Sequence, residues 1–465
     1  MNDAAVPPPL PSSHPAPPRF SRLGAALALC VIAACVAYAA TMHSTHREAD
    51  ETGVHPNRTM ELMARYVVGV KETMTTTALF GGGQAGLEGF PVNFDEMLVQ
   101  NLSQVSRSQA DKLRLLIAKS WLSGSWPAVS ELETVAAQNE GLQADVKSLQ
   151  QMRANHGAVN EDDMKKLRAR HGWFADLARA RALPKSDAAR QAVVQQSTQT
   201  AVVLICFSML GLLLAVGGLV ALILGIVQWR SGNLKLTLAL RSRSQAGVLL
   251  EGFAIYLALF MFVPRLLRHM SVLLPPWAAY GPALLILILG MLWPLLRGIP
   301  RADWRQALGL HRGKGLLREV RAGLLGWVAS LPLMVAGMIA SSWIMRLTGD
   351  VPTHPIVDYF AGGGWEKLGA FLLAVVWAPV SEEIMFRGLL FPGLSAWLRW
   401  LAGMLVGAFV FAAIHPQGWA GVPPIMALAG GFSLLRMWRQ SLIAPMTAHA
   451  LNNGIMCLVM MFLWR

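Results

Sequence analysis

The sequence predicts an all-α, polytopic helical membrane protein with an eight- to nine-span bundle and a helical insertion outside the membrane. Three observations indicate this class. Hydrophobic residues make up 54% of the 465 positions and charged residues only 14%, whereas soluble globular chains carry about 25% charged residues. The mean hydropathy is positive, at +0.43. The apolar residues also gather in runs long enough to cross a bilayer, which requires about 20 residues in a helix.

The N-terminal residues change character twice. Residues 1–22 are rich in proline and polar residues, which predicts a disordered cytoplasmic tail. Residues 23–42 are apolar and just long enough for a first transmembrane helix. A signal peptide is the alternative, because Ala37-Tyr38-Ala39 resembles a small-residue cleavage site. Both interpretations place the residues that follow outside the cytoplasm.

Residues 43–198 are polar and predict a helical extracytoplasmic domain. Apolar residues recur there at helical spacing, and one stripe comprises Leu132, Val135, Leu142, Val146 and Leu149. The region holds no constellation of catalytic residue types. A small helical domain or coiled-coil-like hairpin is therefore favoured over the alternative, a module that senses a substrate or partner.

Further candidate spans lie near 199–227, 247–264, 278–296, 322–345, 367–390, 399–416, 423–437 and 441–463. The loops 228–246 and 297–321 are rich in Lys and Arg, and short basic loops mark the cytoplasmic side. We therefore expect a multi-pass protein of the cell (inner) membrane with a cytoplasmic N-terminus. Residues 199–244 would form a span and a basic cytoplasmic loop, and residues 245–465 the main bundle. These loops also explain the net charge of +13, so no nucleic-acid partner is expected.

Three short segments near the C-terminus place polar or ionisable groups within or beside apolar runs. In chain order these groups are Glu382, Glu383, Arg387, His415, His449 and Asn453. Such side chains are costly at membrane depth and usually face a bundle interior or a water-filled cavity. A carboxylate with an imidazole can deprotonate a water, and an imidazole with a carboxamide can stabilise an oxyanion. The set therefore predicts a site that adds water to an acyl carbon.

The spacing of these residues predicts how they are arranged. Glu383 and Arg387 lie four residues apart on one helix face, which predicts an ion pair. Glu382 points about 100° away from that face. At about 1.5 Å per residue, Glu382 lies roughly 10 Å from the inner end of its span and His449 about 12 Å from the inner end of the last span. His415 lies roughly 24 Å from the start of its own run, a different depth unless that helix is tilted or starts deeper.

Each of these elements alone has a structural explanation. Glu383 and Arg387 can form a buried bridge that fixes helix packing, and His449 with Asn453 can form hydrogen bonds between helices. An isolated His415 would more often be an interior histidine. Together, in order and close in sequence, they favour a reaction site. A proton-coupled transporter ranks last, because no matching set occurs in an earlier part of the chain.

The motifs resemble the pattern EExxxR, FxxxH and HxxxN of the CPBP family, the intramembrane proteases related to the type II CAAX prenyl endopeptidase and to bacteriocin-immunity membrane proteins. The matching residues are Glu382-Glu383 with Arg387, Phe411 with His415, and His449 with Asn453. The resemblance covers roughly residues 245–465 and leaves residues 1–198 outside. It implies an intramembrane peptidase that acts on a membrane-associated protein or peptide substrate.

The resemblance also implies roles for single residues. Glu382 would be the general base that activates water with His415, and His449 with Asn453 would bind the oxyanion. The supporting residues would be Glu383 and Arg387. The family is commonly called a metalloprotease family, which implies a divalent metal such as zinc held by Glu382, His415 and His449. A glutamate-dependent mechanism without metal uses the same residues, and the sequence does not separate the two.

The resemblance leaves the substrate open. The eukaryotic relatives remove the last three residues of prenylated proteins, whereas the charge pattern here indicates a bacterial inner membrane, where such substrates are not expected. The alternative function is a non-catalytic membrane scaffold or bacteriocin-immunity factor that retains the motifs for packing. The sequence predicts no oligomeric state.

Overall fold

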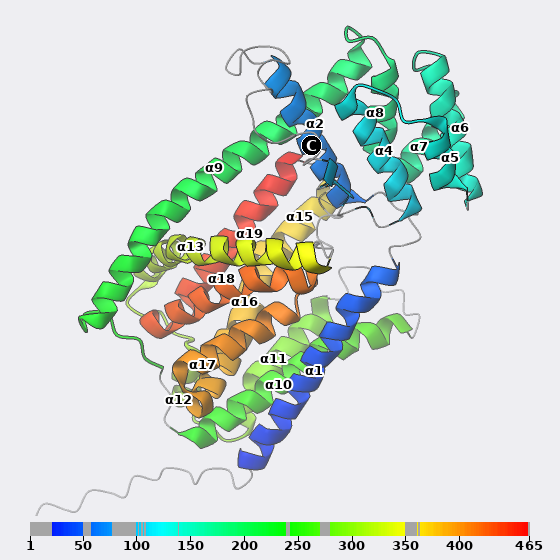
Figure 1. The fold of residues 1–465 in the computed structure, drawn as a ribbon. Helices are drawn as coiled ribbons and strands as arrows, with labels where there is room; N and C mark the ends of the chain where they lie inside the picture. Colours follow the sequence, from blue (N-terminus) through cyan, green and yellow to red (C-terminus); the bar gives the residue numbers. More distant parts are fainter. Residues whose placement is uncertain are drawn as a thin grey trace, which may run out of the picture.

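The computed structural model describes residues 21–49, 57–76, 99–100, 102–103, 106, 108–137, 139–238, 242–269, 280–348, 360 and 363–463. The ordered elements within these residues are all helices, as predicted (Figure 1). The predicted disordered tail, residues 1–22, lies outside the described residues apart from its last two.

A helical domain lies at one end of the molecule (Figure 1). It comprises α2 (Arg58–Thr76), α4 (Gln109–Ser123), α5 (Val129–Ala136), α6 (Glu140–Ala154), α7 (Glu161–His171) and α8 (Trp173–Ala182). Its core is apolar, and Met60 and Phe174 are each at most 1% exposed. The predicted apolar stripe belongs to this core, because Leu132, Val146 and Leu149 are buried in it. Burial of these apolar side chains stabilises the packing of α5 and α6 in the domain.

The domain continues into the helix bundle through α9 (Ala188–Arg230), a single helix of 43 residues. Asp187 caps its N-terminus by accepting a hydrogen bond from the backbone N–H of Ala189. α9 packs against α2 in the domain and against α13 (Leu316–Thr348) in the bundle. A Cβ on Gly218 would lie 2.1 Å from the carbonyl oxygen of Val328 in α13, so this close helix crossing requires glycine.

A second group of helices lies across the bundle from α9 (Figure 1). α1 (Ser21–Ala49) packs along α10 (Arg243–His269), and α10 packs along α11 (Tyr280–Leu296). Glu251 Oε2 accepts hydrogen bonds from Trp293 Nε1 and Arg297 Nε, each at 3.0 Å. These bonds join α10 to the end of α11 through one oxygen of the Glu251 carboxylate. The short α12 (Arg301–Leu308) follows α11.

The C-terminal helices carry the predicted site. They are α15 (Gly364–Leu372), η5 (Leu373–Trp377), α16 (Ala378–Glu383), η6 (Ile384–Leu390), α17 (Phe391–Ala413), α18 (Gly418–Arg439) and α19 (Ile443–Leu463). Within α17, Arg399 is not helical, with φ 65° and ψ 162°. A Cβ on Gly403 would lie 2.8 Å from the backbone nitrogen of Ser395, whereas residues this far apart in a continuous helix are separated by about 12 Å. The chain therefore folds back at Arg399.

Among the described residues, seven helices are long and apolar enough to cross a membrane. Their bounds are Arg22–Thr41, Ala188–Arg230, Arg243–Leu267, Leu316–Thr348, Gly364–Ala413, Gly418–Arg439 and Ile443–Leu463. The apolar helix Pro282–Leu296 is shorter, and Gly364–Ala413 contains the fold-back at Arg399. The chain is a multi-pass membrane protein, and its predicted total of eight or nine spans stays a prediction.

A buried histidine makes the helical domain sensitive to pH. His171 Nε2 donates to Asp145 Oδ2 at 2.9 Å, and the imidazole is fully buried. Burial lowers the pKa of His171, although the hydrogen bond with Asp145 opposes this effect, and the nearby Arg114 and Arg170 lower it further. The folded domain therefore resists protonation of His171, whereas the unfolded chain takes up a proton near pH 6.5.

We expect the domain to lose stability as the pH falls below about 6.5, by at most about 1.4 kcal/mol per pH unit from this group. Above that pH the contribution is fully present, because His171 is then neutral in both states. Amide hydrogen exchange of α6–α8 in the full chain at pH 7.5 and 5.5, corrected for intrinsic exchange rates, measures the loss. His171→Gln should flatten the dependence. Equal protection of the parent protein at both pH values would contradict the assignment.

Candidate active site

The fold-back at Arg399 brings Glu382 and His415 to one level of the bundle. Arg399 stands about midway between them in the sequence, so both lie a similar length of chain from the turn. Glu382 Oε2 and His415 Nε2 are 3.9 Å apart. The different depth expected for His415 is therefore wrong, because the helix that carries Glu382 continues to the turn instead of ending near Leu390.

His449 approaches the same carboxylate oxygen from α19. Its Nε2 lies 3.8 Å from Glu382 Oε2. That oxygen is buried and has no hydrogen-bond partner among the described residues, and the side chains of Glu382 and His415 are 25% and 20% exposed. Separations of 3.8 and 3.9 Å are too long for direct hydrogen bonds, but one water could bridge them with bonds of about 2.8 Å. Each of these two separations is therefore one that a bridging water could span.

The other nitrogen of each imidazole is held by a different kind of acceptor. His449 Nδ1 donates to the carboxylate oxygen Glu383 Oε1 at 2.9 Å. His415 Nδ1 donates to the backbone carbonyl of Phe411, one helical turn earlier. Because the bond at one ring nitrogen fixes the role of the other, both neutral imidazoles present an Nε2 lone pair toward Glu382.

Glu383 and Arg387 form the predicted ion pair, with Nη1 2.9 Å from Oε1. Glu383 is fully buried and Arg387 is 2% exposed. Arg387 Nη2 also donates to the carbonyl of Ala429 in α18 at 3.0 Å. Its guanidinium carbon lies 4.6 Å from the ring centroid of Phe411 and 5.3 Å from that of Phe432, where cation–π attraction is expected. The pair therefore joins η6 to α18 and α19.

Asn453 makes contacts of another kind. Its Nδ2 donates to the carbonyl of Ala374 in η5 at 2.9 Å, and its Oδ1 accepts from Asn452 Nδ2 at 3.3 Å. These contacts join it to the helix preceding Glu382, and within the described part of the chain they do not include Glu382 or either imidazole. The predicted oxyanion role of Asn453 stays a prediction.

A comparison with protein-family models found a match within the C-terminal helices. Residues 364–455 match the model described as type II CAAX prenyl endopeptidase Rce1-like, and this range includes all six predicted site residues. Residues 364–455 form an Rce1-like domain of the CPBP family. No curated protein and no solved structure matches the chain. The recognition made from the three motifs is confirmed.

Several features of the Rce1-like site carry no signal in the sequence. Two π-helical segments, η5 and η6, flank the turn that bears Glu382, and such segments are frequent at functional sites. Phe432 of α18 stacks on His449 with ring centroids 5.3 Å apart. Tyr256 of α10 is 5% exposed and belongs to the same buried apolar cluster as Phe386 and Phe411. Only tertiary structure brings these groups to the site.

The predicted metal ligands are Glu382, His415 and His449. A carboxylate and two imidazoles are of the kind that zinc accepts. No group of three His, Cys, Asp or Glu side chains in the part of the chain that the structure describes has the geometry of a metal site. The metal set stays a prediction, and no step proposed below passes through a metal.

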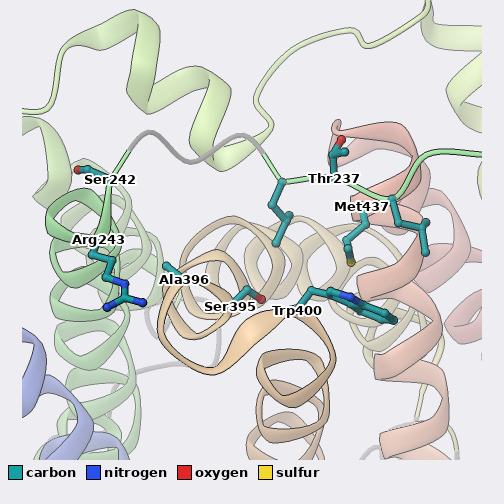
Figure 2. Close-up of a pocket in the computed structure, with 9 residues that line it drawn as sticks. Thr237, Ser242, Arg243, Ser395, Ala396, Trp400 and Met437 are labelled. Carbon is teal, nitrogen blue, oxygen red and sulfur yellow. The ribbon is translucent and has the colours of Figure 1, made fainter.

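A separate cavity of about 480 Å³ lies where residues 236–238 and 242–243 meet α17 and the end of α18. Figure 2 shows Arg243, Ser395 and Trp400 among the side chains around it. None of the six predicted site residues lines it, so it is distinct from the site of the Rce1-like domain.

We expect Arg387→Met to destabilise the protein by about 3–5 kcal/mol, because it leaves the buried carboxylate of Glu383 without its cation. The double variant Glu383→Gln/Arg387→Met should recover part of this loss, since it removes the unpaired charge. Unfolding of the full chain in increasing SDS, followed by far-UV circular dichroism, gives both values. If the double variant is no more stable than the single one, the pair does not act as described.

Proposed function

We propose that the protein is an intramembrane endopeptidase that hydrolyses a peptide bond of a membrane-associated protein or peptide. The observation that best supports this proposal is that Glu382 Oε2 has no hydrogen-bond partner in the described part of the chain. This oxygen faces His415 Nε2 at 3.9 Å and His449 Nε2 at 3.8 Å. A water between Glu382 and His415 could donate one hydrogen to the general base and the other to the imidazole. The Rce1-like domain supports peptide hydrolysis as the reaction.

In the proposed reaction Glu382 takes a proton from this water. The water oxygen then forms a bond to the carbonyl carbon of the substrate, whose oxygen becomes an oxyanion. His415 orients the water as a neutral acceptor, because its Nδ1 is held by a neutral carbonyl. Collapse of the intermediate breaks the C–N bond, and the proton on Glu382 passes to the leaving amine.

His449 suits the oxyanion side of the site. Its Nδ1 already donates to Glu383, so its Nε2 can donate to an oxyanion only in the imidazolium form. The carboxylate of Glu383 is a suitable partner for that charged form. Asn453 would add a second donor if its amide turned from Ala374. We keep Glu382, His415, His449 and Asn453 as the proposed catalytic residues, with Glu383 and Arg387 as positioning residues.

The placement in the membrane is also a proposal. We place residues 43–198 outside the cytoplasm and the N-terminus inside, in a cell (inner) membrane. The arrangement supports this, because the basic stretch that contains α12 and the helical domain lie at opposite ends of the molecule (Figure 1). Basic residues mark the cytoplasmic end.

The test replaces the proposed base without changing its size. We expect Glu382→Gln to lower cleavage by about 100- to 10,000-fold, the contribution of a general base. Glu366→Gln is the matched control, since Glu366 is an exposed carboxylate on α15 of the same Rce1-like domain. Mass spectrometry of membrane-protein termini, from cells producing each variant, compares the newly formed chain ends and works for a substrate that has not been identified.

The variant His415→Ala provides a second, independent test, since it removes the imidazole that orients the water in the proposed reaction. Its loss of activity should be comparable while the amount of inserted protein is unchanged. Identical terminal profiles for the parent, Glu382→Gln and His415→Ala would exclude the peptidase. The non-catalytic scaffold or immunity factor would then be the better interpretation.

A further inference from the structure

The helical domain contains a cavity that the proposed peptidase reaction does not use. It has a volume of about 580 Å³ and lies between α7, α8 and the first turns of α9. This volume is typical of sites for small molecules. Its lining is polar: besides charged residues it includes the side-chain amides of Gln195, Gln196 and Gln199.

The charges in the cavity are not balanced among the described residues. Asp176 is the acidic residue of the lining, and Arg168 binds it through Nε at 2.9 Å and Nη2 at 2.7 Å. Arg179 also lines the cavity and has no ion-pair partner in the described part of the chain. Its Nε is buried and lacks a hydrogen-bond acceptor there. The cavity therefore has a net positive charge and an unused donor.

A second donor in the same lining is also unsatisfied. Trp173 is only 5% exposed, and its Nε1 has no hydrogen-bond acceptor within the described ranges. Buried N–H groups without acceptors are uncommon, because they lose their bonds to water without replacement. Two residues of one lining thus carry such donors, and one of them is the cation Arg179, so a ligand that supplies acceptor oxygens would complement both.

We propose that this cavity binds a small polar anion whose carboxylate or phosphate oxygens accept hydrogen bonds from Arg179 and Trp173. The glutamine amides would hold the polar remainder of the molecule. The oxyanion belongs to a free small molecule or to a lipid headgroup, since the long apolar run of α9 begins soon after Gln199. This inference does not depend on the peptidase.

The experiment uses the full chain in a neutral detergent, labelled with ¹⁵N-tryptophan. Inorganic phosphate and citrate serve as free oxyanions. Vesicles of phosphatidylglycerol, compared with phosphatidylcholine, represent the lipid source. We expect one of these probes to shift the indole N–H signal of Trp173, which the variant Trp173→Phe identifies by its loss. Isothermal titration calorimetry gives the affinity of the same probe.

Arg179→Gln and Trp173→Phe should each weaken binding of that probe about tenfold or more. Arg153→Gln is the control, because it removes an equal charge from an exposed position on α6 and should leave the affinity unchanged. Unaltered melting of the variants without ligand shows that they remain folded. The proposal is overturned if neither the free oxyanions nor the anionic vesicles bind, or if Arg179→Gln and Trp173→Phe bind as the parent does.

Discussion

The rest of the site depends on the two hydrogen bonds that Glu383 accepts, one from Arg387 and one from His449. One carboxylate oxygen accepts from Arg387 Nη1 and from His449 Nδ1, each at 2.9 Å. A fully buried carboxylate is tolerated only when it is paired and hydrogen-bonded, so the helices that supply the partners are held in one arrangement. The bond from Nδ1 also fixes the ring of His449, whose Nε2 then faces Glu382.

The two imidazoles are not equivalent, and the difference comes from what holds them. A carboxylate holds His449, whereas a backbone carbonyl holds His415. The carboxylate can form an ion pair with a charged ring, whereas the carbonyl can only accept a hydrogen bond. Two residues of the same type are thus suited to different parts of the proposed reaction, His415 to the water and His449 to the oxyanion. Among the described hydrogen bonds, neither Arg387 nor a backbone group binds the side chain of Glu382. This carboxylate therefore faces both rings.

How far the sequence predicts the site depends on the range of each interaction. The pair Glu383 and Arg387 was predictable, because residues four apart meet on any helix. The contact between Glu382 and His415 was expected from the motifs but not from depth, since the span that carries Glu382 was expected to end near Leu390 and instead continues to the turn at Arg399. The bond from Asn453 to Ala374 depends on the packing of α19 against η5, which no local pattern encodes.

The helical domain is joined firmly to the helix that carries His449. α9 runs unbroken from the cavity of the domain into the bundle, where it packs against α13 and contacts α19. Arg65 of α2 also donates to the carbonyl of Leu463 at the end of α19, at 3.4 Å. A flexible linker would isolate a ligand in the domain from the bundle. A continuous helix instead couples the domain to α19. A ligand bound in the domain can then shift the packing of α19, by as much as the affinity of the ligand differs between two packing arrangements.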